Sequence, residues 1–126
     1  MTVKEFINKV LINNYQEILS KGFHYISFSL IALGIEFLGA CIDDADDFGK
    51  TEKSGKRFRN AIEDLFPKQY QKFNDKNNDY DICNNLRNGL AHQLRPKSKI
   101  GLTHKKESEK FGTNHLEINN EKLVLV

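Results

Sequence analysis

Residues 23–42, "FHYISFSLIALGIEFLGACI", form the apolar stretch that decides the fold of this 126-residue chain. The stretch is long enough to span a membrane. Glu36 lies well inside it, however, and charged residues are rare within a bilayer, so we expect the central buried helix of a soluble protein. Because a buried carboxylate is costly without a partner, Glu36 requires a donor nearby, and Arg87 is the first candidate.

The segments on both sides of this stretch have the apolar spacing of further helices. Helices are expected at residues 2–20, 55–66 and 79–94, with a short helical piece at 68–74. Gly22 and Pro67 end the first and second of these, Asp79 is expected to cap the last, and Pro96 closes it.

Beyond Pro96 the periodicity changes to that of short strands. "KIGLTHKKE" (99–107) and "HLEINNEKLVLV" (115–126) predict strands, with a turn at "NNE". We therefore expect a mainly α protein. A bundle of four to five helices would occupy residues 1–95, and a short C-terminal antiparallel β extension of the same domain would occupy residues 96–126.

The net charge is small but unevenly distributed. The chain has 19 Lys and Arg against 17 Asp and Glu, a net charge of +2. Residues 43–47, "DDADD", are acidic, whereas 50–72 and 95–110 are rich in Lys and Arg and are candidates for binding RNA or another polyanion. The N-terminus lacks the pattern of a secretory signal, so a cytoplasmic protein with no membrane partner is expected.

The sequence contains no recognisable metal or cofactor pattern. None of the histidines at 24, 92, 104 and 115 has a partner at metal-ligand spacing. The acidic loop fails the calcium-loop pattern, because Phe48 and Gly55 stand where oxygen ligands are needed. There is no glycine-rich phosphate loop, and we expect neither a metal nor a cofactor.

The helix expected at 79–94 contains "RNGLAH", residues 87–92, which raises the functional question. Its core face carries Ile82, Cys83, Leu86, Leu90 and Leu94. Arg87 falls at the edge of that face, whereas Asn88 and His92 lie on the opposite side, where the amide is expected to contact the imidazole. Gly89 costs about 1 kcal/mol relative to alanine in a helix interior, which favours a close approach of another backbone or a ligand.

The stretch "RNGLAH" resembles the Arg-x4–6-His motif of the HEPN superfamily of helical-bundle proteins. In many members a polar residue follows the arginine, as Asn88 does here, and the motif lies on a late helix. The resemblance covers residues 2–95. It implies a bundle that pairs as a two-fold homodimer, so that two motifs line one cleft. Active members are metal-independent endoribonucleases, often toxins or defence effectors, and an antitoxin-like protein is a possible partner.

The resemblance also implies roles for three catalytic residues. His92 would be the general acid or base, Arg87 would hold the scissile phosphate, and Asn88 would orient the histidine or the phosphate. RNA supplies its own nucleophile in the 2′-hydroxyl, so proton transfer and charge stabilisation suffice. The candidate binding residues around this motif are Glu36, Gly89, Arg95 and Lys97.

Two alternatives to a ribonuclease dimer remain open. One is a non-catalytic HEPN-like module that binds a nucleotide, a nucleic acid or a protein. The other is a structural dimer whose C-terminal strands extend a sheet with a neighbour. An Arg87 side chain buried against Glu36 would favour these two alternatives over catalysis.

Overall fold

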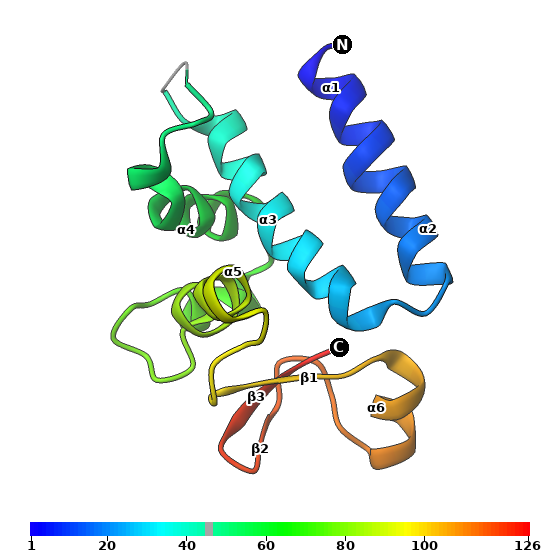
Figure 1. Ribbon diagram of the computed structural model, residues 1–126. Helices are drawn as coiled ribbons and strands as arrows, with labels where there is room; N and C mark the ends of the chain where they lie inside the picture. Colours follow the sequence, from blue (N-terminus) through cyan, green and yellow to red (C-terminus); the bar gives the residue numbers. More distant parts are fainter. Residues whose placement is uncertain (45–46) are drawn as a thin grey trace.

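The computed structural model describes residues 1–44 and 47–126 and is built around one central helix, α3 (His24–Ile42; Figure 1). This confirms the helix expected at residues 23–42. Of the described residues, those of α3 form the one helix long and apolar enough to cross a membrane. Here α3 packs against α2, α4 and the helix that carries the motif, so it serves as a core helix.

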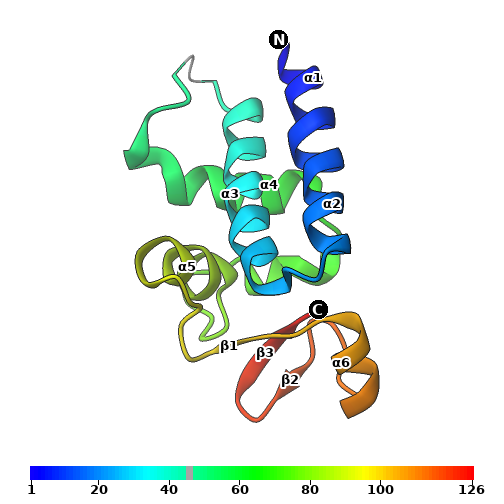
Figure 2. The same cartoon turned by 45° about the vertical axis from the view of Figure 1, so that its right-hand side comes forward.

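The N-terminal helical run lies antiparallel to α3 (Figures 1 and 2). It consists of α1 (Val3–Phe6), the π-helical segment η1 (Ile7–Asn14) and α2 (Tyr15–Ser20). None of the residues in these three segments is buried, so the side chains that face α3 are at most half-buried. The contact is close at Gly34, where an added Cβ would lie 3.3 Å from side-chain atoms of Leu11 and Tyr15.

Helix α4 (Ser54–Leu65) crosses the other side of α3 and confirms the helix expected at 55–66. The two backbones touch at Gly39, where a Cβ would lie 1.9 Å from the carbonyl oxygen of Arg57. Two 3₁₀ segments flank α4: η2 (Thr51–Lys53) before it and η3 (Lys68–Phe73) after it. Because only glycine lacks the Cβ that would clash with the Arg57 backbone, Gly39 allows α3 and α4 to cross in close contact.

After residue 81 the chain forms the π-helical segment η4 (Cys83–Arg87) and helix α5 (Asn88–Gln93). We call these two segments together the motif helix. It packs against both α3 and α4. The chain leaves the helix at Leu94, which adopts a left-handed conformation with φ of 56°. A helix was expected here as far as Leu94, and its existence is confirmed.

Three short strands form the C-terminal sheet: β1 (Ile100–Leu102), β2 (Ile118–Asn119) and β3 (Lys122–Leu125). The strand order is β1-β3-β2, and β3 is antiparallel to β2 but parallel to β1. The expectation of a purely antiparallel extension is therefore wrong for β1. The physical reason is helix α6 (Lys105–Phe111), which lies in the crossover that a parallel pair requires.

The turn expected at "NNE" joins β2 to β3. Asn120 and Glu121 both have positive φ, 49° and 57°, as the two central residues of a tight hairpin turn do.

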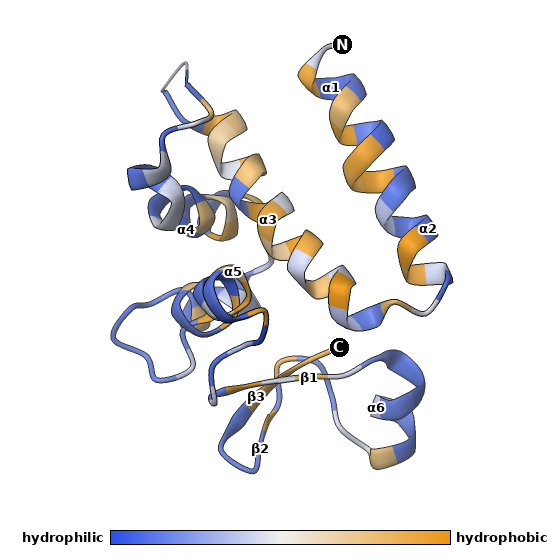
Figure 3. Ribbon diagram, in the orientation of Figure 1, coloured by the Kyte–Doolittle hydropathy of each residue, from blue (hydrophilic) through white to orange (hydrophobic). Residues whose placement is uncertain are grey.

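Buried side chains from the helices and the sheet form one cluster. Its members include Phe58, Ile62, Phe73, Leu86, Leu90, Ile100, Leu123 and Leu125. Residues 96–126 thus share a core with residues 1–95. Figure 3 shows the apolar residues concentrated in α3 and in the inner faces of the elements around it.

Candidate functional site

The motif helix begins at a buried cap. Asp81, whose side chain is 1% exposed, accepts a hydrogen bond from the backbone N–H of Asn84 at 3.1 Å. The guanidinium of Arg59 on α4 donates two further hydrogen bonds to the same carboxylate, at 2.8 and 2.6 Å. The prediction of Asp79 as the cap is wrong, because it is Asp81 whose side chain reaches the first turn.

After an α-type hydrogen bond from the Asn85 N–H to the Asp81 carbonyl, the motif helix widens into a π-helical turn. The N–H of Asn88 donates to the carbonyl of Cys83, five residues earlier. This π-helical turn widens the buried face, so Asn85 is buried as well as Ile82, Cys83, Leu86 and Leu90. The Asn85 amide donates to the carbonyls of Asp79 and Asp81, at 3.0 and 2.8 Å, which satisfies it in the core. Single π turns are frequent at functional sites.

Arg87, the last residue of the π-helical segment, is ion-paired with Glu36. Its Nε donates to Glu36 Oε2 at 2.8 Å, which confirms the expected pair. The two side chains are 15% and 21% exposed, so the pair is partly rather than fully buried. Arg87 Nη1 also donates to Asn88 Oδ1 at 3.0 Å. Glu36 and Asn88 therefore hold one side of the guanidinium, and Nη2 has no hydrogen-bond partner among the described residues.

The Arg87 side chain borders a pocket of about 260 Å³ between α3 and the motif helix. Its other lining residues are Ser29, Ala32 and Leu33 of α3 and Leu90, Ala91 and Leu94. Leu33 and Leu94 are 52% and 77% exposed. The expectation of Leu94 in the core is therefore wrong, because its left-handed backbone turns the side chain away after the helix has ended. The pocket combines one fixed cation with an apolar rim.

His92 lies on a different face of the helix from Arg87. The two residues are five positions apart, about 140° around the axis, and no contact joins them in the structure. His92 is exposed, and in residues 1–44 and 47–126 its ring has no hydrogen-bond or ion-pair partner. The expected contact of Asn88 with His92 is also not formed, since Asn88 Oδ1 binds Arg87 instead.

Gly89 allows the chain to fold back on the motif helix. A Cβ at this position would lie 2.6 Å from the carbonyl oxygen of Arg95 and 2.8 Å from the amide nitrogen of Lys97. The close approach expected at Gly89 is thus made by the backbone of residues 95–97. Since this backbone covers Gly89, the residue is not available to a second copy or a ligand, which corrects its assignment as a binding residue.

Arg95 and Lys97 line a groove between the end of the motif helix and the sheet, together with Lys122 of β3. By contrast, two cations of the basic stretch 50–72 serve the fold. Arg57 is buried and donates to Asp43 Oδ2 and to the carbonyls of Asp47 and Phe48, and Arg59 binds Asp81. That stretch is therefore a weaker candidate for RNA binding than 95–110.

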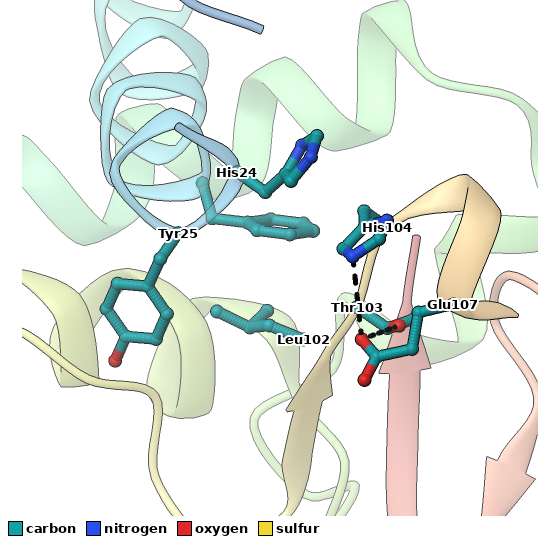
Figure 4. Close-up of a pocket in the computed structure, with 7 residues that line it drawn as sticks. His24, Tyr25, Leu102, Thr103, His104 and Glu107 are labelled. Carbon is teal, nitrogen blue, oxygen red and sulfur yellow. Dashed lines mark hydrogen bonds and ion pairs between the residues drawn. The ribbon is translucent and has the colours of Figure 1, made fainter. Parts of the chain in front are cut away.

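A second cluster brings together residues that sequence reasoning did not connect. The rings of His24 and His104 stack with centroids 4.4 Å apart, because the sheet docks on the start of α3 (Figure 4). Thr103 Oγ1 donates to Glu107 Oε2 at 2.7 Å, and His104 Nε2 lies 4.0 Å from the same oxygen. Eighty residues separate the two histidines, so no local spacing reveals the pair. Parallel rings do not aim their nitrogens at one point, and no group suited to hold a metal ion occurs within the described ranges.

The chain has no significant match among protein-family models, curated proteins or solved structures. A functional proposal therefore depends on the geometry of the residues above and on the resemblance of "RNGLAH" to a known motif.

Proposed function

We propose that this protein is a cytoplasmic, HEPN-like, metal-independent endoribonuclease that acts as a homodimer. The observation that supports it most is the Arg87 guanidinium, which is only partly buried against Glu36, lines a pocket and has no hydrogen-bond partner on Nη2 among the described residues. The exposed His92 follows on the next turn of the same helix. A fixed cation and an available imidazole are the two groups that cleavage of RNA by its own 2′-hydroxyl needs.

The proposed reaction is an internal transfer at phosphorus. The 2′-oxygen attacks the adjacent phosphorus, the bond from phosphorus to the 5′-oxygen breaks, and a 2′,3′-cyclic phosphate and a 5′-hydroxyl end result. His92 accepts the 2′-hydroxyl proton or gives a proton to the leaving 5′-oxygen, and water carries out the other proton transfer. Arg87 stays cationic and stabilises the charge that develops on the phosphate oxygens.

A dimer is part of the proposal because one copy keeps Arg87 and His92 on separate faces. The surface around the Arg87 pocket is apolar and exposed, with Leu33, Ala91 and Leu94 from two elements. Ala91 lies between Arg87 and His92 around the helix axis. An isologous contact at this edge of the surface would bring the arginine of one copy and the histidine of the other to one cleft.

The second candidate is a non-catalytic nucleic-acid-binding module. The ion pair favours it, because Glu36 occupies Nε of Arg87 and lowers the net positive charge that a phosphate would meet. In such a module Arg87 holds the motif helix on α3, and RNA binds elsewhere on the surface without being cut.

Incubation of the purified protein with labelled RNA in EDTA separates the two candidates. The proposal predicts cleavage by the wild type, loss of cleavage in His92→Ala and retention in His104→Ala, which removes a histidine outside the motif. Circular dichroism verifies that both variants are folded. Binding without cleavage by the wild type would favour the non-catalytic module.

A further inference from the structure

A groove lies between the end of the motif helix and the sheet. Its volume is about 480 Å³, and it is lined by Arg95 and Lys97 from the loop after the helix and by Lys122 from β3. Gln93 and Ser98 add polar groups, and among the residues that the structure describes no carboxylate contributes to its lining. The loop and the β2–β3 turn beside it are hydrophilic (Figure 3). The groove therefore presents three cations to solvent.

Two of these cations, Arg95 and Lys97, belong to a loop whose backbone packs against the motif helix. The absence of a side chain at Gly89 lets residues 95–97 lie against the helix. The amide of Lys97 donates to the carbonyl of Asn85 at 2.8 Å, and Lys97 Nζ donates to Asn84 Oδ1 at 2.8 Å. The Lys97 ammonium thus has one donor anchored, which leaves two for a ligand.

Lys122 provides the third cation from the opposite wall. Its side chain lies across Gly101 of β1, whose added Cβ would be 3.9 Å from Lys122 Cβ and Cδ. In the part of the chain that the structure describes, neither Arg95 nor Lys122 has an ion-pair or hydrogen-bond partner for its side chain. Their charges are therefore not neutralised within the protein.

We propose that this groove binds the phosphodiester backbone of a single-stranded nucleic acid. Three cations on two facing walls without a carboxylate match a row of phosphates, and binding of this kind releases counterions. No aromatic side chain of residues 1–44 and 47–126 lines the groove as a platform for base stacking, so the groove contacts phosphates and does not select bases. The role of the groove as a path for an RNA substrate rests on the proposed ribonuclease function. The binding of a nucleic acid to the groove does not depend on that function.

The test is a fluorescence anisotropy titration with labelled single-stranded RNA and DNA oligonucleotides of one mixed sequence. The groove predicts similar affinities for both, within about threefold, because phosphate contacts carry no information on the sugar. Arg95→Ala and Lys122→Ala should each weaken binding and reduce the slope of log affinity against log salt by about 0.7 to 1. Both residues are exposed, and neither side chain has a hydrogen-bond or ion-pair partner among the described residues, so both variants should fold.

Lys9→Ala is the matched control, because Lys9 is an exposed lysine of η1 outside the groove and outside both basic stretches. It should leave the salt slope unchanged. Equal effects of Lys9→Ala and Lys122→Ala, binding of RNA without DNA, or no binding of either would each overturn the proposal.

A cleavage assay on the same variants separates failure of the groove from failure of the proposed function. Cleavage that requires His92 but is unchanged in Lys122→Ala would contradict the groove as the path of the RNA substrate and leave the ribonuclease proposal standing. Salt-dependent binding that needs Lys122, without any cleavage, would support the groove and contradict the ribonuclease proposal.

Discussion

Arg87 is held by two side chains that differ in charge. Glu36 supplies a carboxylate from the central helix, and Asn88 supplies a neutral oxygen from the neighbouring position. Exposed ion pairs contribute about 0–1 kcal/mol, and breaking a fully buried pair from one side costs about 3–5 kcal/mol. With side chains 15% and 21% exposed, this pair falls between the two limits.

A double-mutant cycle measures this interaction. We expect Glu36→Gln and Arg87→Ala each to lower the free energy of unfolding by about 1–3 kcal/mol, since each leaves a partly desolvated group without its partner. The double variant should cost less than the sum. Urea unfolding at one protein concentration measures all variants, because the stability of a dimer depends on concentration. Additive losses would mean that the pair does not stabilise the fold.

The motif helix shows which features of an element a sequence can reveal. Its apolar spacing correctly predicted the buried side chains of Ile82, Cys83, Leu86 and Leu90, and the Glu36 partner followed from the cost of a lone buried charge. The π-helical turn was not predictable, because periodicity assumes a regular α-helix. The burial of Asn85 depends on that turn and on loop carbonyls that only the folded chain brings close.

The cap of the motif helix is a second feature decided by tertiary contacts. Asp79 and Asp81 are both acidic residues near the helix start, and both suit a cap by type. Asp81 takes the role because Arg59, which is 22 residues earlier on α4, reaches its carboxylate. No local pattern contains this information.

Replacement of the two aspartates should therefore have unequal effects. Asp81→Ala removes the cap and leaves the Arg59 guanidinium unpaired, and we expect it to lower the free energy of unfolding by at least about 2 kcal/mol. Asp79→Ala is the matched control, since Asp79 is exposed, and should cost less than about 0.5 kcal/mol. Chemical denaturation compares the two, and equal losses would contradict the assignment of the cap.

At the scale of the whole molecule, His115 ties the sheet to the helical part. Its Nδ1 accepts from the backbone N–H of Val126 at 3.1 Å, so Nε2 carries the proton and donates to Tyr70 Oη at 2.7 Å. Partial burial of the ring lowers the pKa of His115 below its usual value of 6.5. Protonation of Nδ1 would break the bond to Val126.

The stability should therefore fall in mild acid. Because the unfolded chain binds the His115 proton at a higher pH than the folded chain, this contribution is complete above about pH 6.5 and is lost as the pH falls through the lowered value. We expect His115→Gln to reduce the loss of unfolding free energy between about pH 7 and pH 5. His92→Gln, which changes an exposed histidine, should keep the wild-type dependence. An unchanged pH dependence in His115→Gln would contradict the role of this tether.

The fold class followed from the sequence, but the path of the C-terminal segment did not. Alternating apolar residues indicate strands without stating their neighbours, and the parallel pairing of β1 with β3 depends on the length of the crossover that contains α6. The same docking creates the groove that contains Lys122 and the stack of His24 with His104. Sites that combine segments distant in the sequence can be identified only from the folded structure.

Association of two copies should depend on the apolar rim of the Arg87 pocket. We expect sedimentation to show a dimer at micromolar concentration, and Leu94→Glu to shift it toward the monomer, because a charge at this contact would be desolvated. Phe111→Glu changes a side chain of similar exposure on α6, 67% against 77%, and should remain dimeric. A monomeric wild type would contradict a site shared between copies.

The ends of the RNA products test the central claim most directly. In EDTA, the wild type should release fragments with 2′,3′-cyclic phosphate and 5′-hydroxyl ends, because the proposed reaction uses the 2′-hydroxyl as nucleophile and assigns the catalysis to His92 and Arg87. His92→Ala and Arg87→Ala should yield neither end. Cleavage that stops in EDTA, returns with magnesium and leaves 5′-phosphate ends would contradict the account.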